Sequence, residues 1–257
     1  MTQIDKDRWF SPMAIAYDKM ASYLVPRYDF VQDELIGLLF ADGVEDKFVV
    51  DLGAGSGILL DKVLERFPAA RGCWVDHSQE FLSVARQRLA KYGRRVRFVL
   101  ARLEGAWEDE LAEAPDAICS MSAIHHLESA DKRSLYARCF DRLRPGGWFF
   151  NADEMATVFP DAYINTLHYW LNHVERARQD VFESLAKHCR LWCEKFDKWR
   201  LRTVENAHLP KAAGDDIHQG YVEQMQWLGE IGFVNVDLFV KFQLWSLIGG
   251  QKHGASA

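Results

Sequence analysis

Residues 48–60 of the chain read Phe-Val-Val-Asp-Leu-Gly-Ala-Gly-Ser-Gly-Ile-Leu-Leu. The short apolar run at residues 48–52 predicts a buried strand of a parallel sheet that helices cover on both faces. The glycines that follow lack a Cβ, so the backbone can turn sharply and a ligand can approach it closely. A helix beginning near Ser56 would direct unpaired N–H groups at the same point, which suits a negatively charged group. The stretch predicts a nucleotide-type binding site at the end of a first strand, with these candidate residues: Asp51, Gly53, Ala54 and Gly55.

The spacing of the glycines separates two classes of nucleotide site. A dinucleotide fingerprint reads G-x-G-x-x-G, and its third glycine permits close packing of helix on strand. Here the pattern is D-x-G-x-G-x-G, and Ile58 stands where the third glycine would fall. The pattern resembles motif I of the class I S-adenosylmethionine-dependent methyltransferases. The resemblance implies an α/β, Rossmann-like fold, a doubly wound and mostly parallel seven-stranded sheet with an antiparallel terminal strand, and S-adenosyl-L-methionine as cofactor.

Length and composition suit one globular domain over residues 1–257. A chain of 257 residues can bury a sizeable core, and its 49% hydrophobic and 26% charged content is ordinary for a soluble protein. The net charge of −6 argues against a protein that coats nucleic acid. A basic cluster is better explained as a solvated helix face that leads into a strand: Arg86, Arg88, Lys91, Arg94, Arg95 and Arg97.

Cysteine usage and hydropathy bear on where the protein works. The five cysteines show no framework-like spacing, which suits a reducing compartment. No signal peptide is evident at the start, and no apolar run approaches the roughly 18 residues of a membrane span. We therefore expect a cytoplasmic protein with no membrane and no nucleic-acid partner, and we leave a homodimer open.

The second predicted strand ends in an acidic residue. Residues 72–76 read as this strand, and Asp76 follows Asp51 by 25 positions (76 minus 51), near the spacing of a ribose-binding carboxylate. A carboxylate can accept both hydrogen bonds that the ribose hydroxyls offer. The same spacing occurs in dinucleotide sites, so it does not separate the two cofactors. His77 could pack on the adenine, and Ser78 reads as the N-cap of the next helix.

The third predicted strand, residues 96–100, leads to a departure from the family pattern. The resemblance implies an acidic residue here for the adenine amino group, whereas the chain has Arg102. Adenine recognition then falls to a backbone group near Leu103 or to Glu104. We include Arg102 and Leu103 among the candidate cofactor-binding residues.

The fourth predicted strand, residues 116–121, is followed by Ser122-Ala123-Ile124-His125-His126-Leu127. The resemblance implies that this strand ends beside the sulfonium, so Ser120 joins the candidate cofactor residues. The loop resembles those of small-molecule methyltransferases. It does not resemble the Asn/Asp-Pro-Pro-Tyr pattern of enzymes that methylate exocyclic amines of bases, so we expect a small-molecule substrate.

The two adjacent histidines cannot both face one site. One histidine could be a general base or a substrate hydrogen bond, and the alternative is a structural histidine that bonds the neighbouring loop. We predict that His125 faces the substrate as the catalytic residue, because it lies nearer the strand end. We predict no metal site, because Cys189 and Cys193 beside His188 lack the further ligands that a closed zinc site needs.

The regions before and after the predicted parallel strands read as covers for the site. Residues 9–40 predict two lid helices, the first capped by Ser11-Pro12, with a break at Pro26. The spacing of Phe10, Tyr17, Asp18, Pro26 and Tyr28 resembles carboxy-S-adenosylmethionine synthases. The resemblance implies that Tyr17 closes over the cofactor, and an aromatic that only packs two helices together is the alternative.

Residues 155–216 carry aromatic residues at helical spacing, among them Trp170 and Trp192, and predict a helical cap over the substrate mouth. The polar candidates for lining the pocket are His168, Tyr169, Arg176, Arg200 and Arg202. An amphipathic helix over residues 217–231 and two strands over residues 233–240 and 242–248 complete the chain. This ending again resembles carboxy-S-adenosylmethionine synthases.

These observations predict a methyltransferase that moves a methyl group in line from the cofactor to a small molecule. Such a transfer needs a base only if the acceptor must lose a proton. A nicotinamide oxidoreductase is disfavoured by Ile58 and the terminal strand pair. A carboxy-S-adenosylmethionine synthase stays as an alternative, although Leu201 stands where a cation is expected, between Arg200 and Arg202. A non-catalytic S-adenosylmethionine-binding protein is the other alternative.

Overall fold

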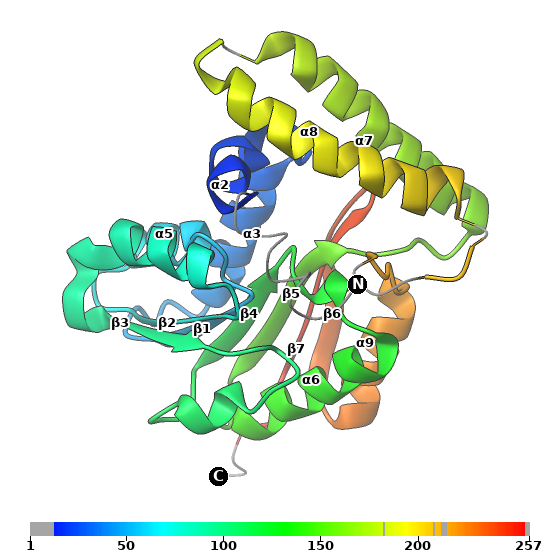
Figure 1. Cartoon of the computed structure of the whole chain (residues 1–257). Coiled ribbons are helices and arrows are strands. Elements are labelled where there is room, and N and C mark those ends of the chain that lie inside the picture. Colours follow the sequence, from blue (N-terminus) through cyan, green and yellow to red (C-terminus); the bar gives the residue numbers. More distant parts are fainter. Residues whose placement is uncertain (1–12, 182, 208, 212–214, 255–257) are drawn as a thin grey trace.

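The computed structural model describes residues 13–181, 183–207, 209–211 and 215–254. Its centre is a sheet of seven strands in the order β3-β2-β1-β4-β5-β7-β6 (Figure 1). The strand bounds are β1 Phe48–Leu52, β2 Arg71–Asp76, β3 Val96–Leu100, β4 Ala117–Met121, β5 Trp148–Glu154, β6 Val234–Phe242 and β7 Trp245–Gln251. Helices cover both faces of this sheet, so the predicted doubly wound α/β class is confirmed.

The terminal strand pair distinguishes this sheet from an all-parallel one. Strands β1 to β5 pair in parallel, whereas β7 runs antiparallel to both β5 and β6. The predicted antiparallel terminal strand is therefore confirmed. Its predicted start at Phe242 is wrong, because Gln243 adopts a left-handed φ of 55° and places the turn after β6.

The helices have the bounds α2 Met13–Leu24, α3 Tyr28–Leu39, α4 Ile58–Arg66, α5 Gln79–Leu89, α6 Ser129–Arg142, α7 Pro160–Asp180, α8 Ala186–Arg200 and α9 Tyr221–Ile231. A π-helical turn, η5, continues α8 over Leu201–Glu205. Helix α4 begins later than the predicted Ser56, because its N-cap Gly57 has a left-handed φ of 79°. The predicted cap of the first helix, with Phe10, lies outside the described residues.

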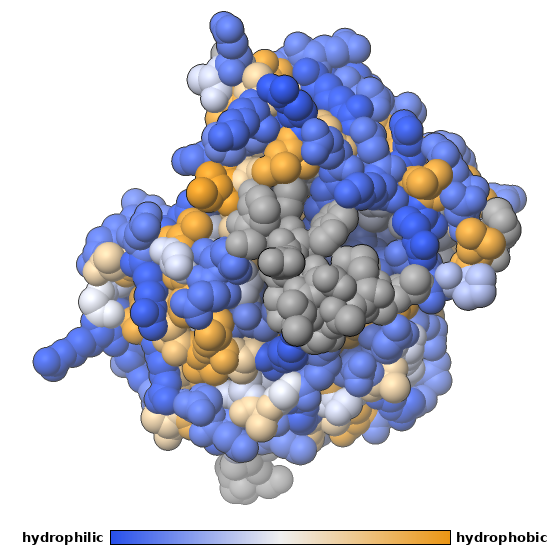
Figure 2. Space-filling view, viewed as in Figure 1, coloured by the Kyte–Doolittle hydropathy of each residue, from blue (hydrophilic) through white to orange (hydrophobic). Residues whose placement is uncertain are grey.

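The core lies on both faces of the sheet. One apolar cluster joins α6 and α9 to one face through residues such as Leu135 and Leu228. Another joins α2, α3 and α4 to the opposite face and continues into α7 and α8. Both β1 and β4 are buried along their whole length, as their apolar runs predict. On the side of the molecular surface that Figure 2 shows, hydrophilic residues dominate and hydrophobic residues form small groups.

The helices α7 and α8 form an antiparallel pair that stands beside α2, above the carboxyl ends of the parallel strands (Figure 1). The indole of Trp170 donates a hydrogen bond to the carbonyl of Leu24 at 2.9 Å. The same ring contacts Trp192, Trp199 and Trp245 edge to face. Part of the predicted aromatic stripe is thus the core that ties the pair to α2 and to β7.

No helix in the described part of the chain is both long enough and apolar enough to cross a bilayer.

Candidate functional site

A cavity of about 630 Å³ opens at the carboxyl ends of β1, β2 and β4. This volume is within the range of small-molecule and cofactor sites, about 300–1,000 Å³. Its lining residues come from α2, α3, the loops after these strands, α8 and η5. We call the cavity residues of α8 and η5 the α8 wall. Nine of the predicted cofactor-binding residues line it: Tyr17, Asp51, Gly53, Ala54, Gly55, Asp76, His77, Arg102 and Leu103.

The loop after β1 is held tightly against the loop after β4. A Cβ placed on Gly53, whose φ is 68°, would lie 2.2 Å from the Cβ of Ala123, so only glycine fits there. The indole of Trp74 donates a hydrogen bond to the carbonyl of Gly55 at 2.8 Å. These contacts fix the glycine loop in the conformation that exposes its backbone to the cavity.

Asp76 connects the glycine loop to the next helix. Its carboxylate accepts a hydrogen bond from the backbone N–H of Gly55 at 2.9 Å and another from the N–H of Ser78 at 2.9 Å. Burial raises the pKa of Asp76, and these backbone donors oppose the rise. A carboxylate has about four acceptor positions, so Asp76 keeps capacity for a ligand's hydroxyl groups. The predicted N-cap Ser78 is confirmed, because its hydroxyl accepts from the N–H of Phe81.

Asp51 has a different environment at the base of the cavity. It is 2% exposed, and its Oδ2 has no hydrogen-bond partner among the described residues. Burial, followed by the negative charge of Asp76, raises the pKa of Asp51 well above its ordinary value. A buried acceptor without a partner that lines a cavity is suited to a donor or a cation from a ligand.

Helix α2 places Tyr17 over the cavity. The ring of Tyr17 contacts Phe81 edge to face with centroids 6.1 Å apart, and burial raises the Tyr17 pKa to about 12. The guanidinium of Arg88 lies 2.7 Å from the carboxylate of Asp18 and donates to the carbonyl of Ser56 at 2.6 Å. Arg88 therefore ties α2, α5 and the glycine loop together.

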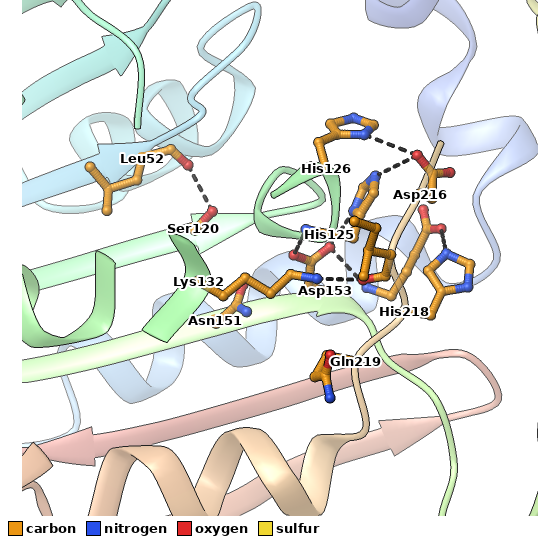
Figure 3. A network of polar contacts seen from close by, with 12 residues as sticks. Leu52, Ser120, His125, His126, Lys132, Asn151, Asp153, Asp216, His218 and Gln219 are labelled. Carbon is orange, nitrogen blue, oxygen red and sulfur yellow. Dashed lines mark hydrogen bonds and ion pairs between the residues drawn. The ribbon is translucent and has the colours of Figure 1, made fainter. Parts of the chain in front are cut away.

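The structure does not support two of the predicted site residues in their predicted places. Ser120 is fully buried and does not line the cavity, because its hydroxyl donates to the carbonyl of Leu52 at 2.7 Å and joins β4 to β1 (Figure 3). His126 lines the cavity and His125 does not. A 3₁₀ turn at residues 124–126 directs His125 inward, toward the end of β5, and this turn was not predicted.

His125 is held by Asp153, the penultimate residue of β5. The Nδ1 of His125 lies 2.6 Å from Asp153 Oδ1, and the His125 backbone N–H donates to Asp153 Oδ2 at 2.8 Å (Figure 3). Burial by itself would lower the His125 pKa. The charges of Asp153, Glu154 and Asp216 outweigh burial and raise that pKa to about 10.

A second group of polar side chains lies beside this pair. Asp216 Oδ1 lies 2.9 Å from His126 Nδ1 and 3.7 Å from His125 Nε2. Although burial would raise it, the neighbouring histidines hold the pKa of Asp216 well below its ordinary value. His218 Nε2 lies 3.0 Å from Glu154 Oε2. The described residues thus include two groups with the composition of a metal site, and Asp216 belongs to both.

The sequence interpretation missed four members of this network. Asp153 and Glu154 end β5, and β4 and β5 are parallel neighbours, so the adjacent carboxyl ends could have indicated a contact with His125. Asp216 and His218 come from an irregular segment before α9, and no periodicity or motif marks them.

The α8 wall differs in part from its predicted composition. Of the polar residues predicted to line the pocket, Arg202 lines the cavity, whereas His168, Tyr169, Arg176 and Arg200 do not. The α8 wall consists of Lys195, Lys198, Trp199, Leu201, Arg202 and Thr203. Most of them follow helical spacing, which could have identified this face. Cys189 and Cys193 lie behind it with their sulfur atoms 3.8 Å apart.

The stretch from β1 to the turn before β5 matches a family model. Residues 49–147 match the model of a methyltransferase domain. Over this stretch the chain is similar to a methyltransferase domain. The matched residues supply strand ends and loops that line the cavity, whereas α2, α3 and the α8 wall lie outside them.

Two curated relatives each match part of the chain. Over 118 residues the chain is 30% identical to the ubiquinone biosynthesis O-methyltransferase of Nitrosomonas europaea. These residues make up 46% of this chain and 46% of that protein. Over 99 residues the chain is 36% identical to the trans-aconitate 2-methyltransferase of Paracidovorax citrulli. These residues make up 38% of this chain and 35% of that protein. The matched stretches span less than half the length of both relatives.

Among solved structures, the chain is similar to the 1,6-didemethyltoxoflavin-N1-methyltransferase of Burkholderia thailandensis, with bound 1,6-didemethyltoxoflavin and S-adenosylhomocysteine. The TM-score is 0.53 at 17% identity, over 93% of this chain and 88% of that chain. At this identity the similarity shows a shared fold.

Proposed function

We propose that the protein is an S-adenosylmethionine-dependent methyltransferase that acts on a small molecule. The observation that carries this proposal is one cavity lined by Asp51, Asp76 and the glycine loop, within a methyltransferase domain. The relatives named above are methyltransferases, and the similar solved structure holds a small molecule together with S-adenosylhomocysteine. These names support a small-molecule acceptor for this chain.

The residues present fit S-adenosylmethionine. The unpartnered Oδ2 of Asp51 would accept from the amino group of the methionine portion. Asp76 would accept from the ribose hydroxyls, and His77 and Tyr17 offer aromatic surface on the same cavity. No ion pair to the buried Asp51 carboxylate is found among the described residues, so the positive charge of the cofactor would compensate it.

The bound cofactor supplies an electrophilic methyl group, so the protein mainly positions the acceptor and excludes water. Within the described residues, the α8 wall and Tyr17 line the same cavity as the glycine loop. The indole N–H of Trp199 has no partner among these residues and is a candidate donor to the acceptor. We propose that residues 155–216 form the substrate cap and residues 9–40 the lid.

A carboxy-S-adenosylmethionine synthase is the second candidate, and one observation favours it. The side chain of Arg202 lines the cavity, where it could pair with an added carboxylate. However, its Nε donates to Asp215 at 3.0 Å, so that carboxylate already engages the guanidinium. The first proposal therefore needs fewer rearrangements.

Mass spectrometry of the ligand retained by the purified protein tests these candidates together. The proposed function predicts S-adenosylmethionine or S-adenosylhomocysteine. A carboxylated form of the cofactor would favour the second candidate, and a nicotinamide dinucleotide would contradict both. Release of labelled S-adenosylhomocysteine on screening small hydroxyl, amine and acid compounds would then identify the acceptor.

The catalytic role predicted for His125 stays a prediction, and the geometry favours its neighbour. His126 lines the cavity, so we expect His126→Asn to lower methyl transfer about 10²-fold, because a misplaced acceptor can cost that much. His125→Asn is expected to act mainly on stability, since His125 is 5% exposed. The measurement is the transfer rate of each folded variant with the identified acceptor. Loss of transfer in His125→Asn with full transfer in His126→Asn would restore the original assignment.

A further inference from the structure

Five side chains from three separate parts of the chain meet beside the cavity. The ligand-type atoms of His125, His126 and Asp216 lie within 4.8 Å of one another, and so do those of Glu154, Asp216 and His218. They come from the turn after β4, from the end of β5 and from the segment before α9. Figure 3 shows His125 and His126 pointing toward Asp216, with His218 nearby. Asp216 joins the two groups into one cluster.

The spacing of these atoms suits a shared cation. Asp216 Oδ1 lies 2.9 Å from His126 Nδ1, and His218 Nε2 lies 3.0 Å from Glu154 Oε2. The third separation, from Asp216 Oδ1 to His125 Nε2, is 3.7 Å. Ligand atoms about 2.0–2.2 Å from one metal ion are about 3–3.5 Å apart. Within each group, small side-chain movements would therefore place the ligand atoms around one ion, and Asp216 belongs to both groups.

Two of the histidines are oriented from behind. Asp153 Oδ1 lies 2.6 Å from His125 Nδ1, and the hydroxyl of Tyr163 lies 2.8 Å from His218 Nδ1. Both partners occupy the ring nitrogen that faces away from the cluster, so Nε2 of each histidine points into it. A metal-binding histidine almost always engages its other ring nitrogen in this way, most often with a carboxylate.

The local charge also accommodates a cation. Asp153, Glu154 and Asp216 bring three carboxylates to the cluster, and the first two are buried. Lys132 donates to the carbonyl of Ile217, and Lys195 lines the adjoining cavity. With the imidazoles neutral, as metal binding requires, the three carboxylates outnumber these two lysines, and the surplus negative charge is available to a cation.

We propose that His125, His126, Glu154, Asp216 and His218 bind a divalent first-row transition metal such as Zn²⁺. Three imidazoles with two carboxylates favour such a metal over Mg²⁺ or Ca²⁺, which prefer oxygen ligands. His126 and Asp216 line the cavity, so a metal bound by them would adjoin it. This site replaces the prediction of no metal, which rested on Cys189 and Cys193. It goes beyond the proposed function, because it adds a metal to the acceptor side of the cavity.

Metal loading of the untagged full chain tests the site without any assay of activity. After treatment with a chelator, the protein is titrated calorimetrically with Zn²⁺, and its bound metal is measured by elemental mass spectrometry. We expect one Zn²⁺ per chain, and Mg²⁺ in excess should not compete. Asp216→Asn and His218→Ala are each expected to weaken Zn²⁺ binding at least tenfold.

Two controls separate this site from other ligands. Asp215→Asn changes the neighbouring carboxylate, which pairs with Arg202, and should leave Zn²⁺ binding unchanged. The double change Cys189→Ser and Cys193→Ser should also leave it unchanged. Near-UV circular dichroism verifies that each variant is folded.

Loading with Co²⁺ keeps the proposal testable if a variant fails to fold. Nitrogen and oxygen ligands give weak visible bands, whereas thiolates add strong near-ultraviolet absorption. Wild-type protein that binds no Zn²⁺, binding that survives Asp216→Asn and His218→Ala, or a thiolate spectrum would each overturn the proposal. Binding of S-adenosylhomocysteine is measured separately, so failure of the metal site and failure of the proposed function are distinguishable.

Discussion

Replacing Gly53 by alanine is expected to lower the unfolding free energy by about 2–5 kcal/mol and to weaken S-adenosylhomocysteine binding tenfold or more. The left-handed backbone, with φ 68°, costs a residue with a Cβ about 1–2 kcal/mol. The added Cβ would also lie 2.2 Å from the Cβ of Ala123, and overpacking of this kind costs about 1–3 kcal/mol. Relief of the clash must move the glycine loop or the loop after β4, and both line the cavity. Urea denaturation and calorimetry measure the two effects.

Gly43→Ala is the matched control for this prediction. Its φ of 75° imposes similar backbone strain, but no atom lies within 4 Å of an added Cβ. It should lose only the strain energy and keep full binding. Equal losses in Gly53→Ala and Gly43→Ala, with binding intact in both, would contradict the contact between the two loops.

Asp153→Ala is expected to lower the unfolding free energy by about 3–5 kcal/mol, because it leaves His125 buried without its charged partner. The lost contacts are those to His125 Nδ1 and to the His125 backbone N–H. Asp153→Asn preserves the shape and one acceptor, so it should lose clearly less. Urea denaturation of both variants makes the comparison. A loss under 1 kcal/mol in Asp153→Ala would show that the pair does not hold the turn after β4.

The strands, and the clustering of the residues that we propose for cofactor binding, were predictable because they obey local rules. The buried runs of β1 and β4 follow from uninterrupted apolar sequence, and the Ser78 cap follows from residue type. The placement of Asp76 follows from its spacing after Asp51. Each inference needs only a few adjacent residues and the parallel arrangement of the strands.

The part of the cavity that we propose for the acceptor depends on tertiary contacts that local patterns do not encode. A three-residue 3₁₀ turn decides which of the two adjacent histidines faces the cavity. His126 lines the cavity, whereas the sequence predicted His125 there. Asp216 and His218 reach the site from an irregular segment with no periodic signal. Helix α4 begins after Ser56 because Gly57 is left-handed, which a glycine permits but does not require.

Calorimetric titration of the purified protein with S-adenosylhomocysteine tests the central claim most directly, that Asp76 and the glycine loop bind the cofactor of a methyltransferase. We predict one site per chain, no binding of NAD, and an affinity about 5- to 150-fold lower in Asp76→Ala, which corresponds to 1–3 kcal/mol for ribose hydroxyls left unpaired. Asp109→Ala, an exposed control, should bind as the wild type does. Absence of binding by the wild type, or unchanged affinity in Asp76→Ala, would contradict the account.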